Sequence, residues 1–392
     1  MKKNFVLILF ACGFAVFSTS LQGQISIDKD ASPGNAKPVL VSLSGITGEA
    51  AQVIQFDLYV QGFAFTNAEA AQYLISGKSN GNLEARVSDR FNKSTVVAKA
   101  YSGATLRRQA HVFVDDFVQA IGRKGIAQTT IAFKGKTGKG SEIFLADFDG
   151  FNPRGVTADG SLVAAPSMIP GQLGMYYVSY KLNHADIFYQ NLSSGSRKVF
   201  AKFGGSNMSP AASPDGQKVA MVLSKDGWPD LYVRGADGSE PVRLTKSRED
   251  ESSPCWSPDG KWICYAAKQP NQRRVLCKIP SSGGSPQQIS TSGAPSPTEP
   301  DWSPDGKWIA FTVQFGKSFQ IYVVPAGGGA AIPLVEGEDP SWASNSRTLV
   351  FARRNSATGN YVLSLLDVPT KQYKDVSRIS GSNSQSQPSW AR

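Results

Sequence analysis

Three aspartates in a repeated motif are the first side chains of this sequence that could do chemistry. The eight residues WSPDGKWI occur at Trp256–Ile263 and again at Trp302–Ile309, and a third SPDG stands at Ser213–Gly216. Repeated carboxylates could act as general acids and bases. However, Pro, Asp and Gly in this order also build a tight turn. Weaker copies of the motif lack an acid at positions 171 and 345, so we interpret three aspartates as turn residues: Asp215, Asp259 and Asp305.

One serine fits the G-x-S-x-G pattern of serine hydrolases. Ser79 lies in GKSNG, Gly77–Gly81, where Gly and Asn predict a turn rather than the strand-to-helix elbow that presents a nucleophile. The two histidines, His111 and His184, have no evident acidic partner in the sequence. His111 lies beside the apolar stripe of an expected helix, which favours a structural role. We therefore expect no catalytic residue.

Possible metal ligands are equally sparse. Asp147 and Asp149 in DFDG could be ligands of a metal-dependent hydrolase, but they fall in an expected turn between two strands. Cys255, Cys264 and Cys277 share one short region without accompanying histidines, which argues against zinc. We expect them to be small buried residues on neighbouring strands, with one disulfide as the alternative. The sequence thus predicts neither a metal nor a cofactor.

The elements that carry these residues form a long repeat. The motif is anchored at Met168, Ala212, Trp256, Trp302, Trp342 and Trp390, and each unit reads as a short strand, a tight turn and further alternating strands. This period with four strands per unit is typical of β-propeller blades. Six second strands and six third strands predict six blades. The tryptophans are expected to pack between blades, where Met168 and Ala212 can replace them.

The two ends of the repeat predict how the ring closes. The cycle begins with a second strand near Ile126 and ends with a lone first strand, PSWAR. We expect residues 388–392 to complete the blade that starts at Ile126, which leaves neither sheet edge free. The predicted propeller therefore spans residues 123–392.

A different organisation precedes the propeller. Residues 1–23 have the layout of a secretory signal peptide, with Lys2 and Lys3 before the apolar run Phe5–Phe17. A lipoprotein signal through Cys12 is the alternative. Residues 24–122 mix expected strands with two helices, one with Ala50 and Leu58 on its apolar face and one over Thr105–Ile121. The predicted fold class is mainly β, a six-bladed propeller preceded by a small α/β domain.

Charge and hydropathy exclude several classes of protein. The net charge is +10, but the basic residues are scattered, and the densest group, in FKGKTGKG, alternates with glycine. Nucleic-acid binding would need a basic stripe with interleaved aromatic residues. No segment beyond the signal approaches the length of a membrane span. We expect an exported, periplasmic and soluble monomer that does not insert into a membrane.

The domain order resembles one family of periplasmic proteins. A signal peptide, an α/β domain ending in LRRQAHVFVDDFVQAI, the junction KGIAQTTIAF and a ring of WSPDG units together resemble the TolB family of the Tol-Pal system. The resemblance implies a binding protein without enzymatic activity. It also implies a link between the inner-membrane Tol complex and the peptidoglycan-associated lipoprotein Pal, which supports outer-membrane integrity and constriction during division.

The resemblance assigns partners to two sets of residues. A TolA-type inner-membrane protein is expected to bind the first mature residues, within the flexible segment 24–34: Gln24, Ile25, Ser26, Ile27 and Asp28. A Pal-type lipoprotein is expected over one mouth of the propeller channel, at loops that enter the first strands: Ser209, Ser253, Thr298, Glu299, Asp339 and Gln387. The alternatives are an exported propeller hydrolase, or a propeller that binds another protein or a glycan.

Overall fold

The computed structural model describes residues 32–103, 105–138, 140–376 and 381–392. The expected signal peptide and the segment Gln24–Asp28 lie outside the described residues. No helix in the described ranges is long and apolar enough to cross a membrane.

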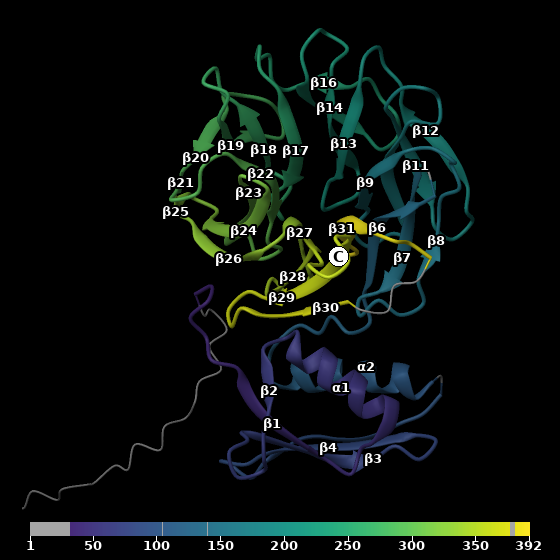
Figure 1. Cartoon of the computed structure of the whole chain (residues 1–392), viewed down its shortest axis with the longest axis vertical. Coiled ribbons are helices and arrows are strands. Elements are labelled where there is room, and N and C mark those ends of the chain that lie inside the picture. The colour runs from purple at the N-terminus through teal and green to yellow at the C-terminus, as the bar shows by residue number, and fades with distance from the viewer. Residues whose placement is uncertain (1–31, 104, 139, 377–380) are drawn as a thin grey trace, which may run out of the picture. The chain divides into compact units, whose positions relative to one another are not determined.

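A small α/β region comes first in the described chain (Figure 1). Its five-stranded sheet has the order β2-β1-β3-β4-β5, in which β1 pairs parallel with both β2 and β3. Two helices pack against each other beside this sheet. The elements are β1 (Val39–Ser44), α1 (Gly48–Tyr59), β2 (Phe63–Phe65), β3 (Tyr73–Lys78), β4 (Leu83–Asp89), β5 (Thr95–Tyr101) and α2 (Leu106–Ala120).

The helices form where the apolar periodicity predicts them. Ala50, Val53, Ile54 and Leu58 of α1 are buried, which confirms their common apolar face. In α2 the hydroxyl of Thr105 accepts a hydrogen bond from the backbone N–H of Arg108 at 3.3 Å and so caps the first turn. The short strand β2 follows α1 directly and has too few residues to show a periodic pattern.

The rest of the described chain folds into six four-stranded sheets, the blades of a β-propeller (Figure 1). Blade 1 contains β31 (Gln385–Trp390), β6 (Thr130–Thr137), β7 (Gly140–Asp147) and β8 (Arg154–Gly155). Blade 2 contains β9 (Val163–Met168), β10 (Gly174–Ser179), β11 (Asp186–Asn191) and β12 (Arg197–Ala201). Blade 3 contains β13 (Asn207–Ala212), β14 (Lys218–Leu223), β15 (Asp230–Gly235) and β16 (Val242–Arg243).

The remaining blades follow the same pattern. Blade 4 contains β17 (Glu251–Trp256), β18 (Trp262–Lys268), β19 (Arg274–Pro280) and β20 (Gln287–Ile289). Blade 5 contains β22 (Pro297–Trp302), β23 (Trp308–Phe315), β24 (Ser318–Pro325) and β26 (Ile332–Glu336). Blade 6 contains β27 (Glu338–Trp342), β28 (Thr348–Arg354), β29 (Tyr361–Asp367) and β30 (Gln372–Asp375). Between blades 4 and 5, β21 (Thr291–Ser292) and β25 (Gly329–Ala330) pair in parallel.

The last strand of the chain lies in the first blade. β31 pairs antiparallel with β6, with Trp390 opposite Ile131 and Gln385 opposite Gly135. β31 comes from the end of the propeller sequence and β6 from its beginning. Their pairing therefore closes the ring and removes two free sheet edges.

The repeated tryptophans pack between blades, as predicted. Trp302 of blade 5 is buried against Cys264 and Leu276 of blade 4. Trp256 of blade 4 packs with Leu231 of blade 3, and Trp342 of blade 6 packs with Ile321 of blade 5. Burying an aromatic side chain of this size removes a large apolar area from water, so these residues hold neighbouring blades together.

The turn interpretation of SPDG is also confirmed. Oδ1 of Asp259 accepts a hydrogen bond from Ser257 Oγ at 2.6 Å and another from the backbone N–H of Lys261 at 3.1 Å. These hydrogen bonds lower the pKa of Asp259, the Ser257 hydroxyl contributing most. In the weaker copy of blade 6, Asn345 Oδ1 accepts from the backbone N–H of Arg347 at 3.0 Å. An amide therefore replaces the carboxylate in the same geometrical role.

Candidate functional site

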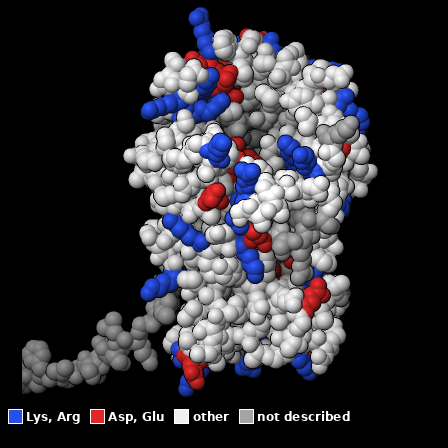
Figure 2. Space-filling model, in the orientation of Figure 1, with Lys and Arg blue, Asp and Glu red and all other residues white. Residues whose placement is uncertain are grey.

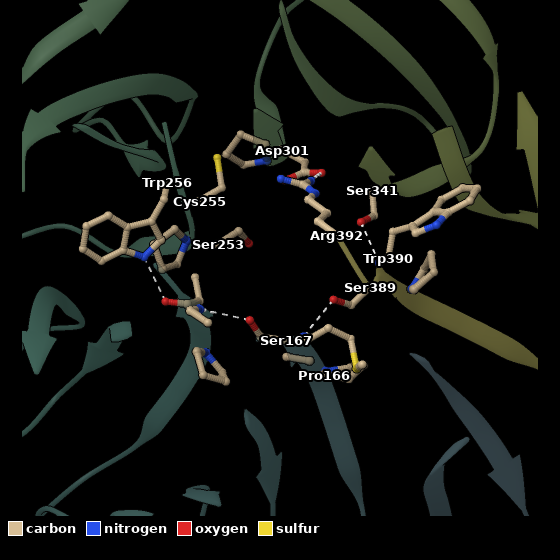
Figure 3. A pocket seen from close by; sticks show the side chains of 18 of the residues that line it. Pro166, Ser167, Ser253, Cys255, Trp256, Asp301, Ser341, Ser389, Trp390 and Arg392 are labelled. Atoms are coloured by element: carbon tan, nitrogen blue, oxygen red, sulfur yellow. Dashed lines mark hydrogen bonds and ion pairs between the residues drawn. The ribbon is translucent and has the colours of Figure 1, made fainter. Parts of the chain in front are cut away.

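A cavity of about 480 Å³ lies where the first strands of all the described blades meet (Figure 3). Each first strand contributes a proline to its wall, at Pro166, Pro210, Pro254, Pro300, Pro340 and Pro388. Proline has no N–H to donate, and these prolines lie on the innermost strands, which face the cavity rather than another strand. The wall is therefore rigid and has few backbone donors.

The residue before each of these prolines has an unusual backbone conformation. Its φ is positive, between 49° and 55°, at Ala165, Ser209, Ser253, Glu299, Asp339 and Gln387. At the same place each described first strand has a β-bulge, where its register with the second strand shifts. Left-handed conformations of residues other than glycine are sparsely populated, and such strain is concentrated at functional sites. The repeated bulge marks this ring as a candidate site.

The predicted channel-mouth residues occupy this ring with one exception. Ser209, Ser253, Glu299, Asp339 and Gln387 all line the cavity. They lie within the first strands, at the bulges, and not in loops before the strands as expected. Thr298 is not part of the cavity wall. Its hydroxyl donates to the backbone carbonyl of Thr312 at 3.4 Å, because it pairs with Thr312 across blade 5.

Ala165, the equivalent residue of blade 2, is in the ring but was not predicted from the sequence. The signal that could have found it is the following Pro166, since every residue of the ring directly precedes a proline. Ala165 and Pro166 were not recognised because the motif of blade 2 is degenerate and reads MIPG in place of WSPDG.

Three side chains of the ring reach from one blade to the next. Oε2 of Glu299 accepts from the backbone N–H of Asp339 at 3.1 Å, and Oδ2 of Asp339 accepts from the backbone N–H of Gln387 at 3.0 Å. Oε1 of Gln387 in turn accepts from the backbone N–H of Ala165 at 3.0 Å. These hydrogen bonds link blades 5, 6, 1 and 2. The equivalent residues of blades 3 and 4, Ser209 and Ser253, have only short side chains.

Two of the three ring side chains that reach a neighbouring blade are acidic, those of Glu299 and Asp339. Burial raises the pKa of Asp339 well above its usual range, and the nearby carboxylates of Glu299 and Glu338 raise it further. Burial and Glu299 also raise the pKa of Glu338 to about 6. The protein thus holds the carboxyl groups of Glu299 and Asp339 at one side of the cavity, with Glu338 next to them, and a neutral or basic group would be stabilised there.

A second level of cross-blade contacts lies two residues further along each strand. Ser167 Oγ accepts from the backbone N–H of Ala212, and Ser389 Oγ from that of Met168, both at 3.1 Å. Oδ2 of Asp301 accepts from the backbone N–H of Trp342 at 2.7 Å. Figure 3 shows the three acceptor residues, Ser167, Ser389 and Asp301, around the cavity. The repetition explains why small polar residues recur there.

Arg392 reaches across the cavity toward blades 5 and 6 (Figure 3). Its guanidinium forms an ion pair with Asp301 and donates to the backbone carbonyl of Trp342 at 3.1 Å. Burial raises the pKa of Asp301, and Arg392 opposes this increase. The SPDG end of the cavity therefore holds an ion pair, whereas the bulge ring holds the carboxyl groups of Glu299 and Asp339.

Of the other candidate residues that the structure describes, Cys255 alone lines the cavity. Ser79 lies in the hairpin between the antiparallel strands β3 and β4, and its hydroxyl hydrogen-bonds to the backbone of Thr47 at 3.2 Å. This position is not a strand-to-helix elbow. The thiols of the described cysteines are free and buried, as the main expectation held. Cys255 and Cys264 face each other on paired strands.

Both histidines have acidic partners, which the sequence reading did not find. Nδ1 of His111 lies 2.7 Å from Oδ2 of Asp57, and Nδ1 of His184 lies 2.9 Å from Oδ1 of Asp186. Asp57 precedes His111 by 54 residues and belongs to the other helix. Only the packing of α1 on α2 brings Asp57 and His111 together.

Asp149 joins the His111 pair from the propeller side. Ligand atoms of Asp57, His111 and Asp149 lie within 4.8 Å of one another, a spacing that a metal ion could bridge. However, the Arg107 guanidinium forms an ion pair with Asp149, and Nε2 of His111 lies 3.7 Å from Oδ2 of Asp149. Since Arg107 already supplies a cation, we interpret this cluster as a polar contact between the α/β region and blade 1.

The fold and the cavity define a class: a six-bladed β-propeller that follows a small α/β region and has a ring of bulged residues around its central cavity. A family model described as "TolB beta propeller domain" matches residues 117–392. The chain therefore belongs to the TolB propeller family.

Curated relatives and a solved structure agree with this assignment. The chain is 30% identical over 186 residues to the Tol-Pal system protein TolB of Desulfosudis oleivorans, and 28% identical over 182 residues to that of Gluconobacter oxydans. These matches cover 45% and 44% of this chain, and 42% and 40% of the relatives. The match thus spans about two fifths of each relative's length. The crystal structure of TolB from Acinetobacter baumannii superimposes with a TM-score of 0.81 at 20% identity, over 92% of this chain and 98% of that chain, which shows a shared fold.

Proposed function

We propose that this protein is a non-enzymatic periplasmic component of a Tol-Pal system. In this proposal it connects the inner-membrane Tol complex to a peptidoglycan-associated lipoprotein, and so supports outer-membrane integrity and constriction during cell division. Family membership and the names of the curated relatives support it. Residues 1–23 would direct export and would be removed.

The observation that carries the proposal is the ring of positive-φ residues around the cavity. A rigid, proline-lined concavity with a few precisely placed polar groups is the usual form of a binding site. Glu299, Asp339 and Gln387 supply polar side chains, while Ser209 and Ser253 leave space on the opposite side. We assign this mouth to the lipoprotein.

A second contact is proposed for the segment before the described chain. Gln24–Asp28 alternates apolar Ile25 and Ile27 with polar neighbours, which suits a strand added to the sheet of a TolA-type protein. A partner at this segment and another at the propeller would use separate parts of the chain.

Calorimetry with the purified soluble domain of the lipoprotein from the same cell envelope tests the proposal. Gln387→Ala and Ser253→Arg should weaken binding, by about tenfold for the blocking Ser253 variant, because both alter the cavity wall. Asp259→Asn, in a turn at the other end of the blade, is the matched control and should bind like the wild type. Absence of lipoprotein binding by the wild type would contradict the proposal. Ester or peptide hydrolysis that is lost in Ser79→Ala would favour a hydrolase instead.

A further inference from the structure

Each described blade has an exposed basic residue in the hairpin that joins its second and third strands, or at the end of the second strand next to that hairpin. We call these residues the basic rim: Lys136, Lys181, Lys225, Arg273, Lys317 and Arg354. Among the described residues of these hairpins, Asp226 is the only acid. The regular spacing, one cation per blade, places positive charge all around the propeller.

The basic rim lies at the same end of the blades as the bulge ring. In blade 5, Pro297 and Thr298 at the start of the first strand pair with Val313 and Thr312, near the end of the second strand. The hairpin that carries Lys317 follows immediately. The other blades repeat this antiparallel arrangement, so the basic residues surround the cavity mouth at which Glu299 and Asp339 lie. In Figure 2, Lys and Arg side chains stand around a hollow in the propeller, and Asp and Glu side chains lie at its edge.

The turns at the opposite end of the blades have a mixed charge. Exposed carboxylates and exposed cations are mixed there. The acids are Asp215, Asp237, Glu240, Asp259 and Asp305, and the cations are Arg154, Lys218, Lys261, Lys307 and Lys371. The excess of positive charge at the hairpin end is therefore a property of one face and not of the whole surface.

Exposed aromatic side chains accompany the cations on half of the hairpins. Tyr180, Trp228 and Phe315 are 40%, 48% and 45% exposed, and they lie beside Lys181, Lys225 and Lys317 in the sequence. Aromatic residues are enriched in protein interfaces, where they supply rigid contact area. A surface that attracted only small ions would not need them.

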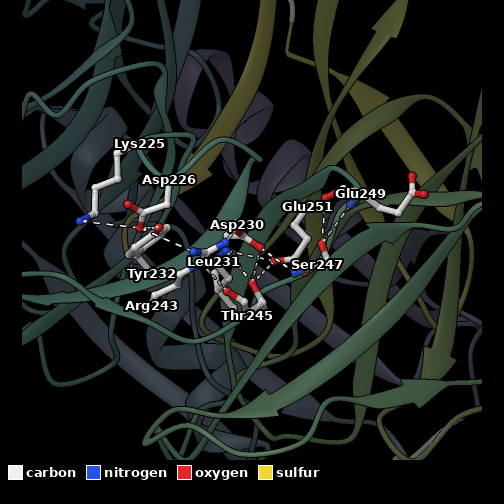
Figure 4. A network of polar contacts seen from close by, with 10 residues as sticks. All are labelled: Lys225, Asp226, Asp230, Leu231, Tyr232, Arg243, Thr245, Ser247, Glu249 and Glu251. Atoms are coloured by element: carbon white, nitrogen blue, oxygen red, sulfur yellow. Dashed lines mark hydrogen bonds and ion pairs between the residues drawn. The ribbon is translucent and has the colours of Figure 1, made fainter.

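The hairpin of blade 3 is held in place by a network of polar contacts (Figure 4). The hydroxyl of Tyr232 donates to Asp226 at 2.6 Å, and Lys225 lies 3.9 Å from the same carboxylate. Arg243 forms ion pairs with both Asp226 and Asp230. Trp228 therefore projects from a fixed hairpin, which reduces the conformational entropy lost on binding.

We propose that the basic rim and its aromatic residues form the docking surface for an acidic protein partner. The inference rests on the function proposed above and specifies the chemistry of the lipoprotein: acidic residues in a circle, with a neutral or basic group at the centre. Glu299 and Asp339 line the cavity at the centre of this ring, and the raised pKa of Asp339 shows that a further negative charge there is disfavoured. A flat, uniformly anionic membrane does not match this pattern, because the positive ring encloses a concave, acidic centre.

Two matched charge-reversal variants test the inference. The rim variant carries Lys181→Glu, Arg273→Glu and Lys317→Glu. The control carries Lys261→Glu, Lys307→Glu and Lys371→Glu, which changes the net charge equally at the opposite end. Binding to the purified soluble lipoprotein domain is measured between 25 and 500 mM salt. We expect the rim variant to bind about tenfold or more weakly at low salt and to lose most of the salt dependence, because electrostatic attraction is screened by ions. The control should stay within about twofold of the wild type.

The possible outcomes separate the two proposals. If the wild type binds the lipoprotein but the rim and control variants behave alike, the basic rim is refuted and the proposed function stands. If the wild type does not bind the lipoprotein, both fail. Wild-type binding to phosphatidylglycerol vesicles that is lost in the rim variant, without binding to the lipoprotein, would assign the rim to a membrane and overturn the inference. Circular dichroism and thermal unfolding establish that both variants are folded.

Discussion

Nδ1 of His111 lies 2.7 Å from Oδ2 of Asp57, and both side chains are buried where the α/β region meets blade 1. The pair is part of the cluster that Asp149 and Arg107 complete. Burial raises the pKa of Asp57 to about 6, and His111 opposes this increase by hydrogen bond and by charge. The contact thus compensates an otherwise costly buried carboxyl group.

His111→Ala should lower the free energy of unfolding by about 3 kcal/mol, because it leaves Asp57 buried without its main partner. Lys78→Ala is the control. Both side chains of its ion pair with Glu84 are exposed, so loss of this contact should cost no more than about 1 kcal/mol. Urea unfolding of both variants measures the difference. Equal losses would refute the role assigned to His111.

Stability should fall as the pH rises through neutrality, and Glu251 should contribute to this fall. Burial raises the pKa of Glu251 to about 7, although Thr245 and the backbone N–H of Leu231 hydrogen-bond to its carboxyl group. The folded protein therefore binds a proton at Glu251 more tightly than the unfolded chain does. This stabilising contribution is complete below the unfolded pKa of 4.5 and is lost as the pH rises through about 7.

Glu251→Gln isolates this contribution. Glutamine stays neutral, so the variant should exceed the wild type in stability at pH 8 by roughly 2 kcal/mol, with the difference vanishing near pH 4 to 5. Thermal unfolding at several pH values measures it. Asp57 and Glu338, with pKa values raised to about 6, change the stability in the same direction but cancel in the comparison. A constant difference at all pH values would contradict the assignment.

The aspartate of SPDG should be replaceable by asparagine but not by alanine. Asp259→Ala loses the acceptor for Ser257 and Lys261 and should cost about 1 kcal/mol. Asp259→Asn should cost only a few tenths, since Asn345 already makes the equivalent contact in blade 6. Chemical denaturation compares the two variants. A greater loss for asparagine than for alanine would count against the turn role.

Arg392→Ala should destabilise the closure of the ring. It removes the guanidinium from the partly buried Asp301, whose pKa should then rise further. We expect a loss of about 2 kcal/mol at pH 7 and a smaller loss near pH 4, where Asp301 in the variant can be protonated. Arg354→Ala, at an exposed hairpin, is the control and should change little. A loss that is independent of pH would show that Arg392 acts through packing alone.

Much of the fold could be predicted from the sequence because its determinants are local. Alternating apolar residues specify strands, and Pro, Asp and Gly specify a turn whatever lies elsewhere in the chain. The motif position that Trp302 occupies recurs six times, which predicts the number of blades. The tryptophans at this position predict the packing between blades. The sequence also placed five of the six expected mouth residues at the cavity wall, because each directly precedes a proline.

Contacts between distant residues were decided by the tertiary structure. Asp57 and His111, Asp301 and Arg392, and the chain of hydrogen bonds from Glu299 to Ala165 all join residues that are far apart in the sequence. The charge of one face likewise appears only when the antiparallel blades bring all six hairpins to the same end. Local patterns by themselves determine strands and turns. The partners of a side chain, its burial and the charge of a face depend on helix packing and on closure of the ring, because these bring together residues that no local pattern relates.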